Sequence, residues 1–220
     1  SAWMARRRSR SAALAFGAVP ASAQPWQPAN GDKLEFDVLR DGGEFGTHLV
    51  KFTRDGDSLT VKTDVALKVA FGPLTLFDYA HDVTERYSAG KLVWVGSRTK
   101  NEGKWKTLSA QPTEGGLDVK GAKFKGILSG IVIPSTHWNR DEMQQSKMFS
   151  TETGEMLLIK VKDLGMETVK AGGKMIEAQR FDVDSEIDAS FWYDNAGRWV
   201  KCAFETQGSK IEYVLRALSS

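Results

Sequence analysis

Residues 126–149 read GILSGIVIPSTHWNRDEMQQSKMF, and this stretch interrupts a chain that otherwise alternates apolar with polar side chains. An apolar run at 127–133 ends at Pro134, which lacks the N–H that would continue a backbone ladder. A polar corner, Ser-Thr-His-Trp-Asn, follows at 135–139. We expect the whole stretch to act as a plug that closes the interior of a sheet formed by the rest of the chain.

The second half of this stretch carries the signals of a short helix. Asn139 is a favourable N-cap, and Glu142 stands three residues later, which is the spacing of a capping box. Trp138 and Met143 have the spacing of the hydrophobic staple that fixes how a chain enters a helix. We therefore predict a short helix that ends near Phe149 and depends on docking for its stability.

Hairpin patterns fill the sequence on both sides of this stretch. Residues 33–40 and 59–71 place apolar side chains at every second position, which is typical of a half-buried strand. Glycine-containing turns such as 41–43 and 207–209 separate successive strands. The sequence predicts a mostly β protein: a single antiparallel curved sheet or half-barrel, built as a meander, with one short helix in the closing segment 126–149.

The N-terminal residues have the order of an export signal. Basic residues at 6–10 precede an apolar run at 12–19, and a small-residue Ala-Ser-Ala cleavage site follows. We predict a signal peptide at 1–23, a linker at 24–32 and a single β domain at 33–220. No later run reaches the ~18 apolar residues that a membrane-spanning helix needs, so we expect no membrane span.

Composition argues against several classes of protein. The 220 residues are 41% hydrophobic and 26% charged, which is ordinary for a globular protein. The formal charge of +2 depends on the arginines at 6–10, so the remaining chain is near neutral and we expect no nucleic-acid partner. Cys202 is the one cysteine, so no intramolecular disulfide can form. Its apolar neighbours predict a buried thiol rather than a reactive one.

Several motifs occur in an order that resembles a known family: Asp78-Tyr79-Ala80-His81 with Glu85, Gly90-x-Leu92, Ser97-x-Thr99, Gly103, Thr136-His137-Trp138-Asn139 and the hairpin from Trp192 to Trp199. Over residues 33–218 this order resembles an uncharacterised family of secreted envelope proteins of Gram-negative bacteria. The resemblance implies an exported, periplasmic protein with no assigned activity. Its strand pattern is similar to the curved sheets of periplasmic outer-membrane lipoprotein carriers, in which a half-open barrel can hold an acyl chain.

Polar side chains on otherwise apolar strand faces are the candidates for a site. Strand alternation places His48 among apolar residues, and it places His81 and Glu85 together on one face. A buried polar group without a partner costs about 1–3 kcal/mol, so we expect these groups to converge. We predict ligand-binding roles, with no catalytic residue, metal ligand or cofactor, for the set His48, His81, Glu85, Ser97, Thr99, Ile131, His137 and Trp138.

Three interpretations of this set remain open. In the first, it is a structural network in which Glu85 orients His81, while His137 bonds the backbone of its corner. In the second, it lines a ligand pocket with apolar walls. The third is a metal or hydrolytic site built from His48, His81, His137 and Glu85, although no local ligand spacing such as His-x-x-x-His supports it.

We therefore expect a non-enzymatic periplasmic protein that binds an apolar or amphiphilic, lipid-like ligand or maintains the cell envelope. The alternative is a structural or protein-interaction module that docks on an envelope protein through a sheet edge or an exposed pair of Trp94 and Trp105. A metal-dependent hydrolase is a more distant alternative. The sequence contains no nucleophile elbow, P-loop or dinucleotide fingerprint.

Overall fold

The computed structural model describes residues 25–218, so the predicted signal peptide at 1–23 lies outside the described residues. One large sheet dominates. Its strands are β1 (Lys33–Arg40), β2 (Gly43–Asp55), β3 (Ser58–Phe71), β4 (Leu74–Ser88), β5 (Lys91–Asn101), β6 (Lys104–Thr113), β7 (Gly116–Lys120), β8 (Lys125–Ser129), β12 (Lys160–Ala171), β13 (Lys174–Asp184), β14 (Ala189–Asp194), β15 (Trp199–Thr206) and β16 (Ser209–Leu215). These 13 strands follow the order β12-β13-β14-β15-β16-β1-β2-β3-β4-β5-β6-β7-β8.

The predicted alternation is present in the strands. In β1, Leu34, Phe36 and Val38 are almost completely buried, while the residues between them are partly exposed. Successive side chains of a strand point to opposite faces, so this pattern places one face of β1 on a core. The prediction of a mostly β protein with one large antiparallel sheet is confirmed.

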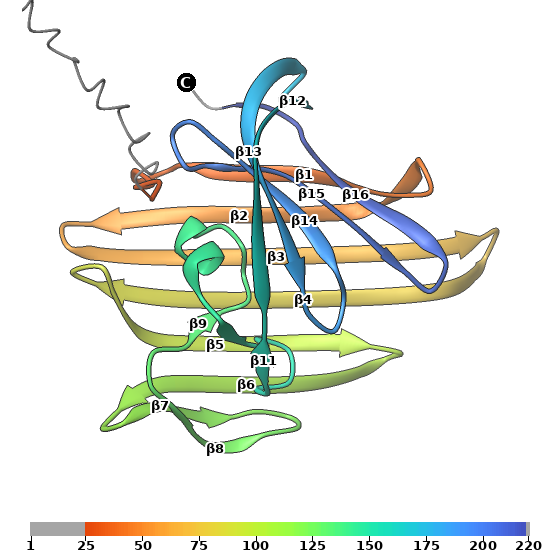
Figure 1. Cartoon of the computed structure of the whole chain (residues 1–220). Coiled ribbons are helices and arrows are strands. Elements are labelled where there is room, and N and C mark those ends of the chain that lie inside the picture. The colour runs from red at the N-terminus through yellow and green to blue at the C-terminus, as the bar shows by residue number, and fades with distance from the viewer. Residues whose placement is uncertain (1–24, 219–220) are drawn as a thin grey trace, which may run out of the picture.

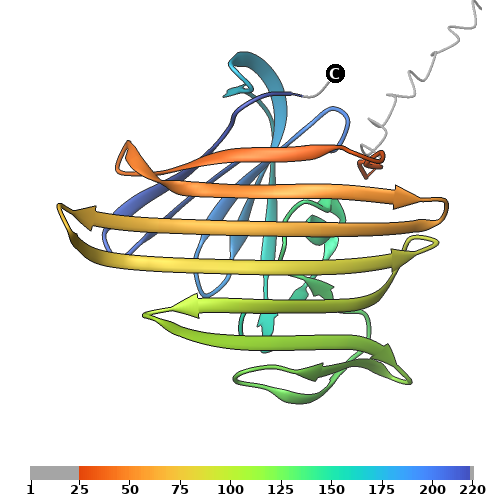
Figure 2. The same cartoon turned by 180° about the vertical axis from the view of Figure 1, so that it is seen from behind.

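β1 joins the two ends of the described chain. It pairs with β2 on one side and with β16 on the other, and Phe36 lies opposite both His48 and Leu215. Two meanders, β1–β8 and β12–β16, are therefore parts of one sheet. In Figures 1 and 2 the strands β12–β16 cross one face of the strands β1–β5 at a steep angle, so the sheet curls over itself.

The sheet is not closed into a barrel. Within the described chain, β8 and β12 are its two edges, and they do not pair with each other. A core fills the space between the two crossing parts, and it contains residues from both, including Phe52 of β2 and Trp199 of β15. The half-barrel prediction therefore describes the architecture correctly.

The first half of the predicted plug is not a plug. Residues 125–129 form β8, which pairs with β7 and ends the sheet. Ile127 is 56% exposed and Ile131 is 85% exposed, whereas Leu128 is buried. The prediction was wrong here because an edge strand with one exposed face can carry apolar side chains on both faces.

The second half of that stretch does enter the interior. It forms β9 (Ile133–Pro134) and β10 (Lys147–Phe149), which join β11 (Met156–Leu158) in a small three-stranded sheet of the order β11-β10-β9. Trp138, Met143 and Met148 belong to the main core cluster. Residues 133–149, called the strap below, therefore close the interior in place of the predicted 126–149.

The predicted helix is shorter than expected. A 3-10 helix, η1, spans Arg140–Gln144, and the chain then turns extended and enters β10. The Asn139 side chain accepts a hydrogen bond from the backbone N–H of Asp141, which confirms the N-cap. The Glu142 side chain bonds His137 instead of completing the predicted capping box. No helix among residues 25–218 is both long and apolar enough to cross a membrane.

Candidate functional site

A cavity of about 470 Å³ lies between the inner faces of β2–β4, the strands β15 and β16, and the strap with the residues that follow it. Apolar and polar side chains share its lining. The apolar ones include Phe45, Val65, Leu67, Ile187, Phe204 and Ile211. The polar ones include His48, Tyr79, His81, Ser135, His137, Thr151, Glu152 and Tyr213. Three histidines that are far apart in the sequence thus line one cavity.

His81 is fully committed to hydrogen bonds. Its Nδ1 lies 2.7 Å from Thr99 Oγ1, and its Nε2 lies 3.0 Å from Thr151 Oγ1. The Ser97 hydroxyl donates to the backbone carbonyl of Thr151. Burial lowers the pKa of His81, although the charges of Glu152 and Asp82 oppose this effect. These contacts make His81 a structural link between β4, β5 and the turn after the strap.

His48 packs among aromatic rings. Its ring lies 5.3 Å from that of Trp199 and 5.1 Å from that of Tyr213, and its Nδ1 is 3.3 Å from the Tyr213 hydroxyl. The Nε2 atom is buried without a partner among the described residues. Burial lowers the pKa of His48 to about 3, and the nearby charges of His137 and His81 act in the same direction. His48 is therefore neutral at physiological pH.

His137 combines an unusual backbone with a partnered ring. Its φ of 66° lies in the left-handed region, which non-glycine residues rarely adopt. Its Nδ1 lies 2.6 Å from Glu142 Oε2, and Glu142 is almost fully buried. The Tyr193 hydroxyl donates to the His137 carbonyl at 2.7 Å. The His137 side chain remains 25% exposed where it lines the cavity.

Glu85 lies outside the cavity lining and anchors the strap. Its carboxylate accepts hydrogen bonds from the Tyr87 hydroxyl at 2.7 Å, the Thr136 hydroxyl at 3.1 Å and Trp138 Nε1 at 3.0 Å. Burial raises the pKa of Glu85 to about 7 even though these three bonds lower it, and the charge of Glu142 raises it further. The interpretation in which Glu85 orients His81 was wrong, because Glu85 bonds these three side chains while both ring nitrogens of His81 bond threonines.

The remaining predicted residues separate into three groups. Ser97 and Thr99 do not line the cavity but bond residues that do: Ser97 bonds Thr151, and Thr99 bonds His81. Trp138 is buried in the core, where it contacts Phe52 and Tyr87 edge to face. Ile131 is on the surface and does not line the cavity.

Glu142, Thr151 and Tyr213 have roles that the sequence analysis did not identify. The spacing of Glu142 from His137 was present in the sequence, but Glu142 was assigned to a capping box. Thr151 and Tyr213 carry no local signal, because they reach the histidines from positions 70 and 165 residues away. Contacts of this kind depend on the curl of the sheet.

Trp94 and Trp105 do not form the predicted pair. The register of β5 with β6 places Trp105 opposite Lys100, and places Ala110 opposite Val95. Each indole instead has its own cation: the Arg86 guanidinium lies 4.7 Å from the Trp94 ring centre, and that of Arg98 lies 4.8 Å from the Trp105 ring centre.

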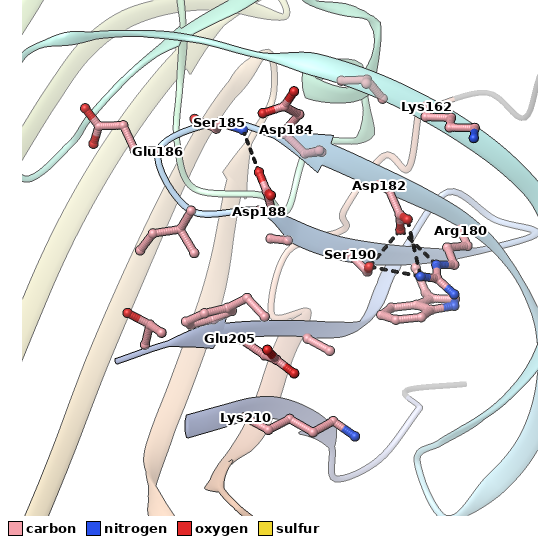
Figure 3. Close-up of a pocket in the computed structure, with 18 of the residues that line it drawn as sticks. Lys162, Arg180, Asp182, Asp184, Ser185, Glu186, Asp188, Ser190, Glu205 and Lys210 are labelled. Atoms are coloured by element: carbon pink, nitrogen blue, oxygen red, sulfur yellow. Dashed lines mark hydrogen bonds and ion pairs between the residues drawn. The ribbon is translucent and has the colours of Figure 1, made fainter. Parts of the chain in front are cut away.

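A second, larger hollow of about 1210 Å³ lies over β12–β16. Its lining residues Arg180, Asp182 and Asp184 alternate along β13 with the core residues Phe181 and Val183, so they point away from the core. Figure 3 shows that Arg180 and Asp182 are paired and that Ser190 bonds both. Because these charges satisfy each other, this surface is a weaker candidate than the inner cavity.

Metal binding has no geometric support in the described chain. Among residues 25–218, no group of three or more His, Cys, Asp and Glu side chains is arranged to hold a metal ion. His48, His81 and His137 share a cavity, but each has at least one ring nitrogen bonded to a separate partner. The interpretation of these histidines with Glu85 as a metal site is therefore not supported.

The fold and the cavity define an open, β-barrel-like protein with an internal pocket. The chain belongs to the family described as "Domain of unknown function (DUF6134)", whose model matches residues 36–216. A search of the curated proteins finds no match. Among solved structures, this chain is similar to the crystal structure of a β-barrel-like protein of the domain of unknown function DUF1849 from Brucella abortus. That match has a TM-score of 0.62 at 13% identity, and it covers 84% of this chain and 95% of the other, which shows a shared fold.

Proposed function

We propose that this protein binds an apolar or amphiphilic, lipid-like small molecule in the inner cavity, and that it does so without catalysis. The observation that carries the proposal is the cavity of about 470 Å³, in which apolar walls surround a few placed polar groups. Ligand pockets in proteins commonly have volumes of about 300–1,000 Å³ and this type of lining.

The apolar walls have a chemistry suited to a hydrocarbon chain. Val38, Phe45 and Ile211 form a small buried cluster, against which Leu67 and Phe204 pack. Phe77 and Ile187 also line the cavity and are 37% and 49% exposed. A bound hydrocarbon chain would remove this apolar surface from water, which stabilises a complex by about 25 cal/mol per Å².

The test is to fill the cavity and measure what remains bound. Leu67→Trp adds bulk to the wall, so we expect purified Leu67→Trp protein to lose small molecules that native mass spectrometry finds on the wild type. Val93→Trp is the matched control, because Val93 is 45% exposed on β5 and is not part of the cavity lining. Wild-type protein that is empty after purification and takes up no added amphiphile would refute the proposal.

We further propose that binding takes place in the periplasm, in support of the cell envelope. The support is the predicted signal peptide at 1–23, which has basic, apolar and small-residue segments in the required order. Cell fractionation of the full chain tests this location. Recovery of uncleaved protein from the cytoplasm would contradict it.

A further inference from the structure

The three histidines that line the cavity differ in how many of their ring nitrogens have hydrogen-bond partners. Both ring nitrogens of His81 have hydroxyl partners. The Nε2 of His48 is enclosed, with almost no accessible surface. His137 uses only its Nδ1, and its Nε2 has no partner among the described residues although the side chain is 25% exposed. His137 therefore lines the cavity and has one ring nitrogen, Nε2, that is not used by the described residues.

Three contacts hold this ring in place, and a fourth holds its backbone. Glu142 Oε2 bonds the Nδ1 at 2.6 Å, and the His137 ring lies 4.6 Å from Phe191 and 5.9 Å from Trp199. Tyr193 fixes the backbone by donating to the His137 carbonyl. A left-handed non-glycine residue is strained and persists only where its surroundings enforce it, and such residues cluster at functional sites. The backbone at His137 is strained in this way, with φ at 66°.

The partner of Nδ1 determines what Nε2 can do. A carboxylate oxygen accepts hydrogen bonds, so the tautomer that donates to Glu142 Oε2 carries its proton on Nδ1. In a neutral imidazole the other nitrogen then has a lone pair and acts as an acceptor.

We propose that His137 Nε2 accepts a hydrogen bond from the head group of the bound ligand, which selects amphiphiles whose head carries an O–H or N–H donor. This inference rests on the ligand-binding function proposed above and names the ligand class. Ethers and esters of the same length have no such donor. An anionic head is disfavoured, because Glu142 lies behind the ring and Glu152 also lines the cavity.

Cations near the cavity do not reverse this preference. Arg40 is the cation in the cavity lining; it lies on the exposed end of β1, and its Nε donates to Ser209. The carboxylate of Glu152 accepts from the Tyr79 hydroxyl. Of the charged side chains in the cavity lining, Arg40 thus lies at the exposed end of β1 and Glu152 is the acidic one, which favours a neutral hydroxyl or a protonated amine as the head group.

The test compares amphiphiles that differ only in the head. Displacement of the fluorescent probe N-phenyl-1-naphthylamine gives affinities for 1-decanol, decylamine, methyl decyl ether and decanoate. We expect decanol or decylamine to bind about tenfold more tightly than the ether, which is the effect of one net hydrogen bond. The decanol and decylamine arms distinguish a hydroxyl from an amine head.

Two variants assign the preference to His137. His137→Asn keeps a residue that tolerates left-handed backbone, and we expect it to bring the affinity ratio of donor head to ether close to one. His81→Gln is the matched control on the same cavity, and it should change both affinities together and preserve the ratio. A stability defect alone would also leave the ratio unchanged.

The outcomes separate this inference from the proposed function. If the probe and the amphiphiles bind but wild-type protein shows no preference for donor heads, the role of His137 is refuted and ligand binding stands. A preference that persists in His137→Asn also refutes that role. If neither the probe nor any amphiphile binds, both proposals fail. The wild-type comparison needs no variant, so a misfolded His137→Asn protein does not remove the test.

Discussion

Glu85 is a carboxylate enclosed by protein on all sides, and it links β4 to the strap through Thr136 and Trp138. Its pKa rises from 4.5 to about 7 in the folded state because burial disfavours the charged form. Between these two pH values the folded protein binds more protons than the unfolded chain. Linkage then requires the free energy of unfolding to fall as pH rises through this window.

We predict that the Glu85→Gln variant loses this pH dependence. The shift from 4.5 to about 7 corresponds to at most about 3 kcal/mol of stability between pH 4.5 and pH 7. His48 acts with the opposite sign, since its pKa falls from 6.5 to about 3 and stability rises with pH in that range. The difference in free energy of unfolding between wild type and variant, taken at each pH, isolates the contribution of Glu85. Urea unfolding at a series of pH values measures it, and parallel pH profiles would contradict the assignment.

The hairpin of β1 and β2 depends on a close backbone approach at Gly46. The register of this pair shifts between Val38 and Leu39, and Gly46 lies opposite Val38 next to the shift. A Cβ atom at Gly46 would lie 1.9 Å from the carbonyl oxygen of Ala66 on β3. That distance leaves no room for any side chain unless the strands separate.

We predict that Gly46→Ala lowers the free energy of unfolding by more than about 3 kcal/mol, because it forces two backbones apart. Gly43→Ala is the control in the same hairpin, since a Cβ there would have its nearest contact at 3.5 Å. The control should change stability by less than about 1 kcal/mol. Thermal or urea unfolding of the two variants checks this difference. Equal stabilities would show that β2 and β3 can relax around the added carbon.

At the level of elements, the strands could be predicted from sequence because their signal is local. Leu34, Phe36 and Val38 alternate with polar residues and are buried as expected. The apolar run at 127–133 was misassigned, because a strand at a sheet edge and a buried plug have similar composition. The length of the helix was overestimated. Its N-cap is present, but the predicted C-terminal end, Met148 and Phe149, pairs as a β-strand with Ile133 and Pro134.

At the level of the whole molecule, the candidate site could be predicted only in part. The alternation of side chains along a strand correctly predicts that His48 and His81 point to the interior. It says nothing about the pairing of β1 with β16, which brings Tyr213 to His48 from 165 residues away. The curl of the sheet decides which inward side chains meet, so the cavity becomes visible only in three dimensions.

The continuity of the sheet through β1 predicts that its two crossing parts separate only when the whole protein unfolds. Cys202 on β15 tests this, because it is 3% exposed in the core that both parts share, and burial raises the pKa of its thiol. A buried, protonated thiol does not react with alkylating reagents until it is exposed.

We therefore expect iodoacetamide to label Cys202 at the rate of global unfolding, and this rate should increase with urea as strongly as unfolding itself does. A cysteine placed at Glu186, in the exposed loop between β13 and β14, with Cys202→Ala in the same chain, should label at the rate of a free thiol and calibrates the assay. Labelling of Cys202 that is much faster than unfolding and insensitive to urea would mean that β12–β16 opens from β1–β8 as a separate unit. The cavity between them would then open with it, and a ligand would enter between the two parts of the sheet.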